Sequence, residues 1–346
     1  MTIAEDRRVI TGGVDTRAGT HVAAALDPIG GLPGVRELPV TPAGYARLPG
    51  WPGGLGAVAL AGIGGAGSYG AGLARHVTAA GIRVVEVGRS DRQDRRRQGK
   101  PDPLDAVSAA RAAQSGRARG TPKGGDGAVE ATRALTVARR SARSGRAQAV
   151  SQARALIVAG PDDLRARFAG HTTAALASGL ASLRPRPGGT AGHATRIALR
   201  EPGRRAELPG GQVGRPDELI VPLATARAPG LPALHGAGPG TAALLLTAAG
   251  DHPERLRPEA ARAHLRAVAP IPASPGKATR RRLNPGGDRQ ASHAPWRIVI
   301  TRMSSRAPTR AHVERRTAGG LPKKEIIRCL KRHVAREAYR HPRPAA

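Results

Sequence analysis

The chain has 346 residues, and its 56 Lys and Arg against 25 Asp and Glu give a formal net charge of +31 and a pI near 11.8. A charge of this size makes a polyanion such as nucleic acid the first partner to consider, although codon bias would also explain the arginines, since only six of the cations are Lys. The single cysteine, Cys329, excludes an internal disulfide and a zinc site built from several cysteines.

Apolar segments of the kind used for targeting or membrane insertion do not occur in the sequence. The first twenty residues carry charges where a signal peptide would have an apolar segment, and no run of eighteen apolar residues is found. Aromatic residues make up 2% of the chain, so the core must be built from Ala, Val, Leu and Ile. We therefore expect a soluble intracellular protein.

The first third of the chain alternates between predicted strands and helices. Short apolar runs between Gly- and Pro-bearing turns predict five strands, at residues 8–15, 21–26, 35–40, 57–62 and 83–87. Helices are predicted from Thr41, the N-cap before Pro42, then over 68–81 and from Asp102 onward. This order is the one expected of a ribonuclease-H-like α/β domain, whose mixed sheet carries its first acid, here Asp15, on strand one.

A long amphipathic helix is predicted over residues 126–160. Its apolar face is formed at steps of three and four by Ala128, Ala131, Leu135, Ala138, Ala142, Ala149, Ala153 and Leu156. Arg139, Arg143 and Arg146 form a stripe off that face, which is either solvated or in contact with phosphates.

Two features follow this helix. Residues 183–232 are crowded with Pro, Gly and Arg and predict a linker or a damaged segment. A Gly-rich turn over 236–240 then precedes an apolar helix over 241–249. Such a turn either directs backbone N–H groups at a phosphate, as helix-hairpin-helix motifs do, or simply joins two helices.

The C-terminal segment is predicted to be mainly helical. A basic loop over 276–289 is followed by a helix around Trp296 and by a last helix from Lys323 to about Arg340. In the last helix the apolar face is formed by Ile327, Leu330, Val334 and Ala338, and the residues predicted off that face are Lys324, Arg328, Lys331 and Arg332.

Residues 62–67, GIGGAG, match the dinucleotide-binding pattern G-x-G-x-x-G between a predicted strand and helix, with Glu86 at the end of the next strand. A nicotinamide-dependent oxidoreductase is therefore an alternative. Two observations argue against it: the strand is the fourth of its domain instead of the first, and no substrate domain follows. Chance matches are also frequent in a chain this rich in glycine.

Three aspartates could share a metal ion. Asp102 and Asp105 are three residues apart, so a helix places them on one face, and Asp15 ends the first strand. Clustered carboxylates are the ligands that Mg²⁺ prefers, and paired ions can stabilise both oxygens of a phosphodiester displacement. The alternative is that Asp102 caps the helix and Asp105 interacts with its dipole.

Several long blocks resemble one family. They include GGVDTRAGTHVAAALD, the segment from GAGSYGAGLARHV to RRRQGKPDPLDA, GAGPGTAALLLTAAG, AVAPIPASPGK, RRLNPGGDRQASHAPWRIVITRM and KKEIIRCLKRHVAREAY. From about residue 8 to residue 340 the chain resembles the DEDD-type insertion-sequence transposases of the IS110 class, with the weakest likeness between 183 and 232.

The resemblance implies four regions. They are a ribonuclease-H-like DEDD domain at 8–122, a helical spacer at 123–182, a poorly specified linker or damaged coiled-coil segment at 183–230, and a mainly α C-terminal transposase domain at 231–340 with a helix-hairpin-helix-like turn. It also implies a bacterial, cytoplasmic, nucleoid-associated recombinase that works as a homo-oligomer. Such an enzyme would cleave and exchange DNA strands under the direction of a structured guide RNA, using Mg²⁺ and a serine nucleophile.

By resemblance, the metal-binding and catalytic acids are Asp15, Asp102 and Asp105. The family's second acid belongs at Gly64, and its nucleophilic serine belongs at Pro275, so that Ser274 is the remaining candidate nucleophile. The residues expected to contact nucleic acid are Gly236, Gly238, Lys277, Arg280, Arg281, Arg282 and Arg289.

Two substitutions and several prolines bear on activity. Gly64 and Pro275 replace expected catalytic residues, and Pro202 and Pro295 fall where helices are expected, at a cost of about 3 kcal/mol or more each in a helix interior. The sequence therefore predicts a transposase of low activity. The alternative is a remnant that binds DNA or RNA without catalysis.

Overall fold

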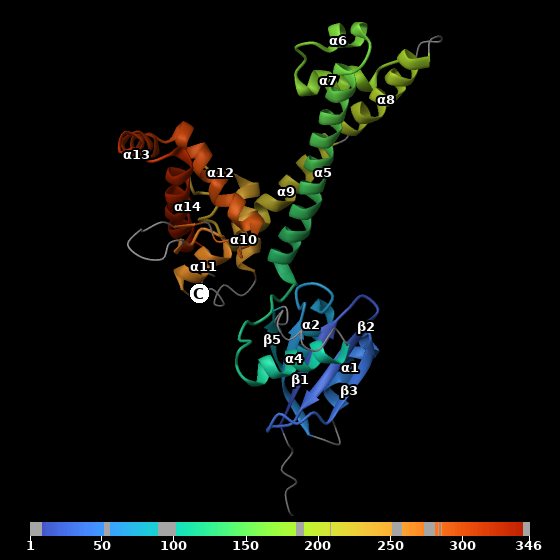
Figure 1. Ribbon diagram of the computed structural model, residues 1–346, viewed down its shortest axis with the longest axis vertical. Helices are drawn as coiled ribbons and strands as arrows, with labels where there is room; N and C mark the ends of the chain where they lie inside the picture. Colours follow the sequence, from blue (N-terminus) through green and yellow to red (C-terminus); the bar gives the residue numbers. More distant parts are fainter. Residues whose placement is uncertain are drawn as a thin grey trace, which may run out of the picture. The chain divides into compact units, whose positions relative to one another are not determined.

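The computed structural model describes residues 9–51, 56–88, 102–184, 190–207, 209–250, 258–272, 281–282, 284 and 286–341. Within this part, the chain forms two compact units (Figure 1). The N-terminal unit comprises residues 1–125 with 250–255, and the C-terminal unit comprises 126–249 and 256–346.

The N-terminal unit is built on a mixed five-stranded sheet. Its strands are β1 (Val9–Thr16), β2 (Thr20–Leu26), β3 (Gly34–Pro39), β4 (Ala57–Gly64) and β5 (Arg83–Val87). They lie in the order β3-β2-β1-β4-β5, in which β2 is antiparallel to both β1 and β3, whereas β4 is parallel to both β1 and β5. This is the predicted ribonuclease-H-like arrangement, and it places the end of β1 between the start of β2 and the end of β4.

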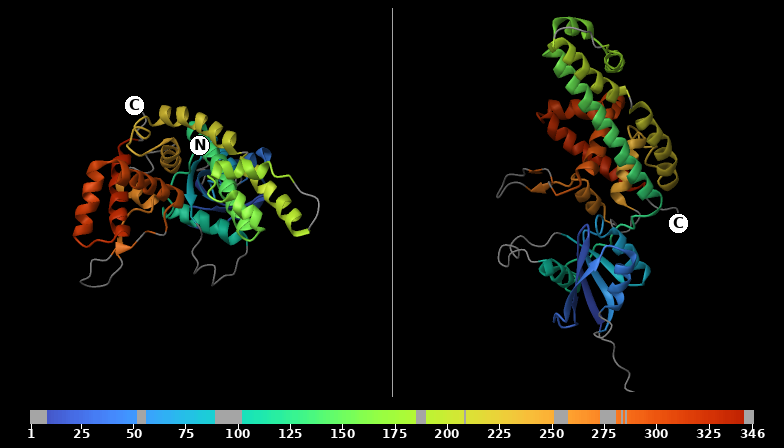
Figure 2. Two further views of the ribbon diagram at one scale, coloured as in Figure 1. Left: turned by 90° about the horizontal axis from the view of Figure 1, so that it is seen from above. Right: turned by 90° about the vertical axis from the view of Figure 1, so that its right-hand side faces the viewer.

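Helices cover both faces of this sheet (Figure 2). On one face, α1 (Pro42–Gly50) and α2 (Ala71–Ala79) bury Leu48 and Leu73 against Ile63 of β4. On the other face, α4 (Asp102–Gln114) lies so close that a Cβ added at Gly62 would be 2.6 Å from the carbonyl oxygen of Ala109. Because the strand glycines have no side chain, the backbone of α4 can pack directly against the sheet.

The predicted helix boundaries in this unit follow from local chemistry. The side chain of Thr41 accepts a hydrogen bond from the Gly44 N–H at 3.1 Å, and Pro42 begins α1, which confirms the predicted cap. Gly81 has a φ of +80°, a left-handed conformation that favours glycine, where the chain turns from α2 into β5.

The C-terminal unit is helical in its described part apart from a short pair of strands. Its helices are α5 (Gly127–Val158), α6 (Asp162–Phe168), α7 (Thr173–Ala181), α8 (Thr190–Glu207), α9 (Pro209–Arg227), α10 (Pro239–Ala249), α11 (Glu259–Leu265), α12 (Arg289–Ser305), α13 (Ala307–Ala318) and α14 (Lys323–Tyr339). The two strands, β6 (Ile271–Pro272) and β7 (Arg281–Arg282), are antiparallel.

Two hydrophobic clusters organise these helices. The end of α5 packs with α6, α7 and α8 around Leu164, Phe168 and Leu199. A larger cluster joins the beginning of α5 with α9, α10, α12 and α14 around Leu245 and Ile298. Alanine and leucine supply most of both clusters, as the composition predicts.

The helices α8 and α9 occupy most of the segment whose composition predicts a linker. Both continue through prolines, at Pro202 in α8 and at Pro216 and Pro222 in α9, and α12 continues through Pro295. Close packing accompanies two of these sites. Pro295 is buried in α12, and Pro202 is buried beside Gly203, where a Cβ would lie 2.6 Å from the Ala181 N. The predicted region boundaries stay a prediction.

Two predicted helix faces differ from the structure. In α5 the buried residues include Val129, Thr132 and Ile157, whereas Leu156, predicted on the apolar face, is 38% exposed. Alanines occur all round this helix, so their spacing does not fix the buried side. In α14 Lys331, predicted off the apolar face, is buried, and its amine donates to the Ser292 hydroxyl at 3.0 Å, which offsets part of the cost of burying it. Among the described helices, none combines the length and the apolar character needed to cross a membrane.

Candidate active site

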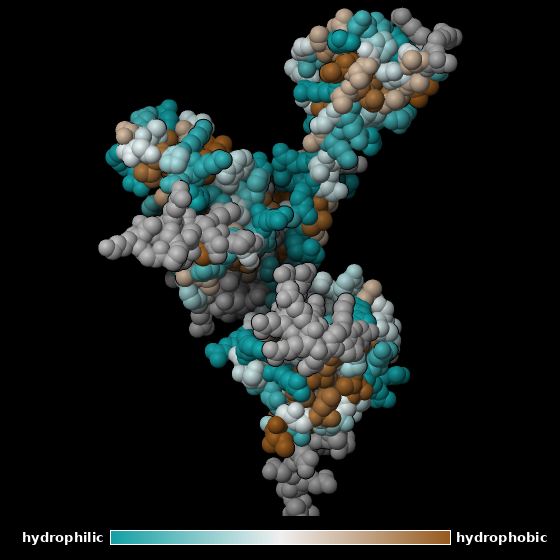
Figure 3. Space-filling model, in the orientation of Figure 1, coloured by the Kyte–Doolittle hydropathy of each residue, from teal (hydrophilic) through white to brown (hydrophobic). Residues whose placement is uncertain are grey.

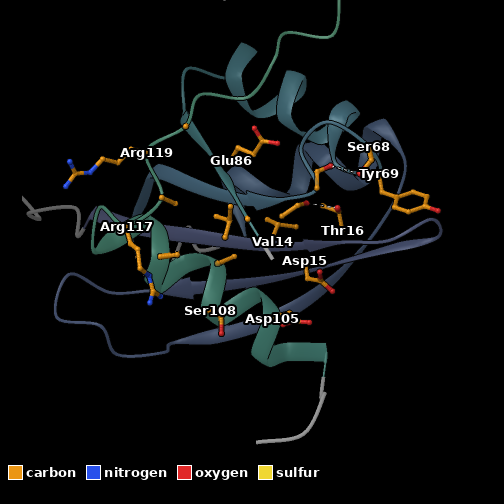
Figure 4. Close-up of a pocket in the computed structure, with 18 residues that line it drawn as sticks. Val14, Asp15, Thr16, Ser68, Tyr69, Glu86, Asp105, Ser108, Arg117 and Arg119 are labelled. Atoms are coloured by element: carbon orange, nitrogen blue, oxygen red, sulfur yellow. Dashed lines mark hydrogen bonds between the residues drawn. The ribbon is translucent and has the colours of Figure 1, made fainter. Parts of the chain in front are cut away.

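A pocket of about 710 Å³ lies where β1, β4 and β5 end and α4 begins. Its lining includes Asp15, Gly64, Glu86 and Asp105, which come from four different elements (Figure 4). Ligands of α/β sheets bind at this carboxyl edge, where strand ends bring residues distant in sequence together.

The strand pattern directs Asp15 toward α4. A Cβ on Gly13 would collide with α4, at Ala106 and Ala110, so position 13 faces that helix. Because side chains two apart along a strand share a face, Asp15 points to the same side. It lies one residue before the end of β1, beyond the tight strand–helix contact, and so reaches the open pocket.

The helix α4 supplies the second carboxylate. Asp105 lies in its first turn and lines the pocket with Asp15, which brings together two of the three predicted acids (Figure 4). Asp102 is the first residue of α4, and its side chain lies outside the described part of the structure.

Gly64 lies at the position where a third acid would complete the set. Gly62 faces α4, so position 64, two residues further along β4, faces the same side as Asp15. A Cβ there would lie 3.4 Å from the Val14 carbonyl oxygen, an ordinary contact, and Gly64 is not among the glycines with positive φ. The backbone would therefore accept a glutamate whose side chain enters the pocket.

Glu86 borders the pocket from the other face of the sheet. It pairs with Ile63, whose side chain is buried with α1 and α2, and paired residues of parallel strands point to the same side. Figure 4 accordingly shows Glu86 pointing away from Asp15 and Asp105. Its backbone N–H donates to the Gly120 carbonyl at 2.6 Å, which fixes the strand edge there. Glu86 is thus poorly placed to replace the acid missing at Gly64.

Cationic and polar groups surround the two aspartates. Arg17 Nε lies 3.3 Å from Asp15 Oδ2, and Arg117 and Arg119 line the same pocket. Thr16 donates its hydroxyl hydrogen to the Gly64 carbonyl at 2.7 Å and so ties the ends of β1 and β4 together. Nothing in the local sequence of Arg117 and Arg119 distinguishes them from the many other arginines of the chain, so their place at the pocket follows only from the fold.

His21 is a further residue that the sequence did not indicate. It is buried on β2 opposite Thr16, and its ring stacks on Tyr45 with centroids 5.8 Å apart. Burial lowers the pKa of His21, against the opposing influence of the Thr20 backbone and the Asp15 charge. The neutral ring accepts the Arg17 N–H at 3.3 Å through Nδ1, which helps to shape the turn after Asp15.

The donor chemistry of the pocket fits a divalent cation in part. Asp15 and Asp105 offer carboxylate oxygens, the ligands that Mg²⁺ prefers, from a strand and a helix that face each other. Among the described residues, however, no three His, Cys, Asp or Glu side chains are grouped closely enough to hold a metal ion. The described part of the pocket therefore offers the carboxylates of Asp15 and Asp105 on the α4 side of the sheet.

The predicted C-terminal site residues are only partly described. Ser274, Pro275, Lys277 and Arg280 lie outside the described residues. Arg281 and Arg282 form β7, but their side chains are outside the described part, and Arg289 is exposed at the first turn of α12. Gly236 and Gly238 lie in the turn before α10, as predicted.

Comparison with known families agrees with the geometry of the N-terminal unit. Residues 12–159 match the model of the IS110-class DEDD family, which is described as a transposase. This part of the chain is similar to the DEDD transposases. The matched transposase segment contains Asp15, Gly64 and Asp105, and also the GIGGAG sequence that resembles a dinucleotide-binding pattern. No curated protein matches the chain.

Proposed function

We propose that this transposase cleaves and exchanges DNA strands at insertion-sequence ends, with the chemistry at the Asp15–Asp105 pocket. One observation carries the proposal: two acids predicted from distant parts of the chain line one pocket inside the segment that matches the transposase family. Asp102 would join them from the start of α4.

The residues around the pocket suit a phosphodiester substrate. Asp15 and Asp105, with Asp102, would hold Mg²⁺, which when bound supplies positive charge for the oxygens of the scissile phosphate. Arg17 keeps the Asp15 carboxylate oriented, and Arg117 and Arg119 place positive charge at the pocket wall for a DNA backbone. Thr16 fixes the distance between the ends of β1 and β4, and hence the width of the pocket.

The rest of the reaction is proposed from the resemblance. Ser274 would act as the nucleophile, and the basic residues from Lys277 to Arg289 would neutralise backbone phosphates. A structured guide RNA would select the DNA, and the protein would act as a homo-oligomer in the bacterial cytoplasm near the nucleoid. The net charge of +31 supports polyanionic partners of both kinds.

Strand cleavage of a labelled element-end oligonucleotide, with Mg²⁺ and the element's RNA, tests the role of the pocket. Asp105→Asn preserves the size of the side chain and removes its charge, so we expect it to abolish cleavage. Glu86→Gln is the matched control, because Glu86 borders the same pocket from the opposite face and should leave cleavage unchanged. Equal loss in both variants would count against the assignment.

A second candidate function is a nucleic-acid-binding protein that has lost catalysis. It is favoured by Gly64, which places no ligand in the pocket, and by Pro275 at the expected serine. The double substitution Gly64→Glu with Pro275→Ser distinguishes the two. If the lost residues are the reason for low activity, cleavage rises in the double variant, whereas no gain together with intact folding would favour a protein that only binds.

A further inference from the structure

A second pocket, of about 540 Å³, lies in the C-terminal unit at the beginning of α10. We call it the arginine pocket. Its wall is formed by Arg139 of α5, Arg297 and Thr301 of α12, and the Gly-rich turn from Pro232 to Thr241. Three elements distant in sequence therefore meet there, and the larger hydrophobic cluster around Leu245 and Ile298 holds them together.

Two glycines allow this close approach. Gly236 has a φ of +81°, and a Cβ there would lie 3.2 Å from the Ile298 carbonyl oxygen and 3.3 Å from the Thr301 Cβ. A side chain at this position would strain the turn and press on α12. At Gly240, a Cβ would lie 2.7 Å from Arg139 Nη1, so the guanidinium group packs directly on the first turn of α10.

The pocket has more positive charge than its carboxylate can neutralise. Arg139 forms an ion pair with Asp217 of α9, donating from Nη2 to Oδ2 at 3.0 Å. Arg297 adds a second guanidinium group, and Arg143 follows one turn after Arg139 on α5. Burial lowers the pKa of Arg143, and the charges of Arg139 and Arg297 lower it further, which places the three groups within electrostatic reach.

Backbone groups add to this positive field. The Gly238 carbonyl accepts hydrogen bonds from the N–H groups of Thr241 and Ala242, which starts α10 directly at the pocket. Pro239 has no N–H, and the N–H groups of Thr241 and Ala242 already donate to Gly238, so the backbone contributes mainly through the helix dipole, which is positive at this end. The 11-residue α10 thus points its positive end at the space that Arg139 and Arg297 border.

We propose that the arginine pocket binds a phosphodiester group of a nucleic-acid backbone. The guanidinium group of Arg presents paired donors that match two phosphate oxygens, and backbone N–H groups read no base. The pocket is formed mainly by backbone and by the tips of arginines, so it would hold DNA or RNA regardless of sequence. Figure 3 shows mostly hydrophilic residues over the middle of α5 and the adjoining part of α12, which suits a solvated polyanion.

This inference deepens the proposed function by giving the nucleic-acid binding expected at Gly236 and Gly238 a defined site, and the site requires neither the metal nor strand cleavage. The fold brings the arginine stripe of α5 and the Gly-rich turn, which are about 100 residues apart in the sequence, to one pocket. The spacer helix would then hold nucleic acid jointly with the C-terminal helices, in place of acting only as a connection.

Binding measured without metal separates this site from the catalytic pocket. The probes are a labelled 20-nucleotide single-stranded DNA, the RNA of the same sequence and the corresponding DNA duplex, titrated by fluorescence anisotropy in EDTA at several salt concentrations. Arg297→Gln should lower the slope of log affinity against log salt by about 0.9 for the duplex or about 0.7 for a single strand, the contribution of one phosphate contact. Arg310→Gln removes the same charge from an exposed position on α13 and should lower the slope less.

Two further measurements distinguish loss of this site from a general loss of positive charge and from unfolding. Gly240→Ala keeps every charge but moves the Arg139 guanidinium group, so it should weaken binding without changing the melting temperature. Hydrogen exchange of the amides from 236 to 242 should slow on saturation with the DNA probe in the wild type and in Arg310→Gln, but much less in Arg297→Gln. A loss with DNA alone, with RNA alone or with both supports the site and identifies the strand. Equal slopes for Arg297→Gln and Arg310→Gln, with no slowing of exchange in the wild type, would overturn the proposal.

Discussion

Position 64 faces the same side of the sheet as Asp15 and carries no carboxylate, so a single residue decides how many ligands the pocket offers. The contact that a Cβ would make there, 3.4 Å from the Val14 carbonyl oxygen, is an ordinary one. Glu86 does not replace the missing carboxylate. It lies two residues after Val84 and pairs with Ile63, and the side chains of both pack on the opposite face of the sheet. The backbone at position 64 therefore has room for a side chain that would add a third carboxylate to the proposed site.

Divalent-metal affinity tests this at the residue level. Gly64→Glu should tighten Mn²⁺ binding, measured by electron paramagnetic resonance on the whole chain, by about tenfold or more, equivalent to about 1.4 kcal/mol. The reason is that a third carboxylate adds an oxygen ligand and neutralises more of the cation's charge. Glu86→Gln serves as the control and should leave Mn²⁺ affinity as it is. Tighter binding that persists after Asp15→Asn would contradict a shared site.

Arg302 illustrates how a buried charge holds the C-terminal helices. Arg302 is 4% exposed, and its guanidinium group donates to the His235 carbonyl at 2.7 Å and to Glu337 Oε2 at 2.6 Å. The hydrogen bond from Arg302 lowers the pKa of Glu337, with smaller contributions from the charges of Arg306 and His341 and against the effect of burial.

The Arg302–Glu337 pair predicts a pH dependence of stability. Because the pKa of Glu337 is lower in the folded than in the unfolded chain, its stabilisation is present above the unfolded value, about 4.5, and is lost as the pH falls through the folded value. At pH 7, Glu337→Gln should lower the free energy of unfolding by about 1 kcal/mol, since Glu337 is 39% exposed and solvent screens the pair.

Urea denaturation from pH 7 to pH 3 measures this dependence. The wild type should lose more stability over this range than Glu337→Gln does. Glu325→Gln removes one partner of an exposed pair with Arg328 and is the matched control, for which little change is expected. An identical pH dependence in wild type and Glu337→Gln would rule out the pair as its source.

At the scale of elements, the helix α9 shows packing overriding local preference. It contains Pro216 and Pro222, yet it packs against α5 and α10 through Ile220 and Ala224, which are buried. Proline in a helix interior removes one backbone hydrogen bond and crowds the preceding turn. The tertiary contacts must therefore offset a local cost in α9.

Pro222 is exposed, so its replacement isolates that local cost. Pro222→Ala should raise the free energy of unfolding by up to about 3 kcal/mol, because the helix gains a hydrogen bond and loses no buried contact. Thermal denaturation followed by circular dichroism at 222 nm would show the change. Pro229→Ala, at an exposed proline just past the end of α9, should have a small effect. A lower melting temperature for Pro222→Ala would show that the proline is favoured where it lies.

The elements also show what the sequence can predict. The strand order and the cap at Thr41 follow from short-range chemistry, since alternation, turns and a hydroxyl before Pro42 act within a few residues. The buried side of α5 does not follow from short-range chemistry, because alanine suits either side of a helix. The burial of Lys331 does not either, because its hydrogen-bond partner Ser292 lies 39 residues away in the sequence.

The same limit applies to the candidate site. Asp15 and Asp105 could be predicted from the residues together with the family resemblance, and the structure brings them to one pocket. The contributions of Thr16 and His21 could not, because their roles depend on the register between strands and not on spacing along the chain. For the same reason the arginine pocket is visible only after α5, α10 and α12 have been brought together.

For the whole molecule, the excess of 56 Lys and Arg over 25 Asp and Glu predicts binding that is steeply sensitive to salt. If six or more phosphates are neutralised, affinity for an unrelated DNA duplex should fall by roughly a thousandfold or more between 50 and 200 mM salt, because counterions are released on binding. Filter binding across that range measures the slope. A slope of log affinity against log salt near zero would mean that the Lys and Arg side chains do not contact DNA phosphates.

The most direct test of the central claim is recombination between a donor and a target plasmid, with the element's RNA and Mg²⁺. The chains compared are the wild type, the double variant Gly64→Glu with Pro275→Ser, and the double variant carrying Asp15→Ala as well. The claim that Asp15 belongs to the catalytic pocket predicts more recombinants from the double variant than from the wild type, and none once Asp15 is removed. Recombinants that survive Asp15→Ala would contradict it.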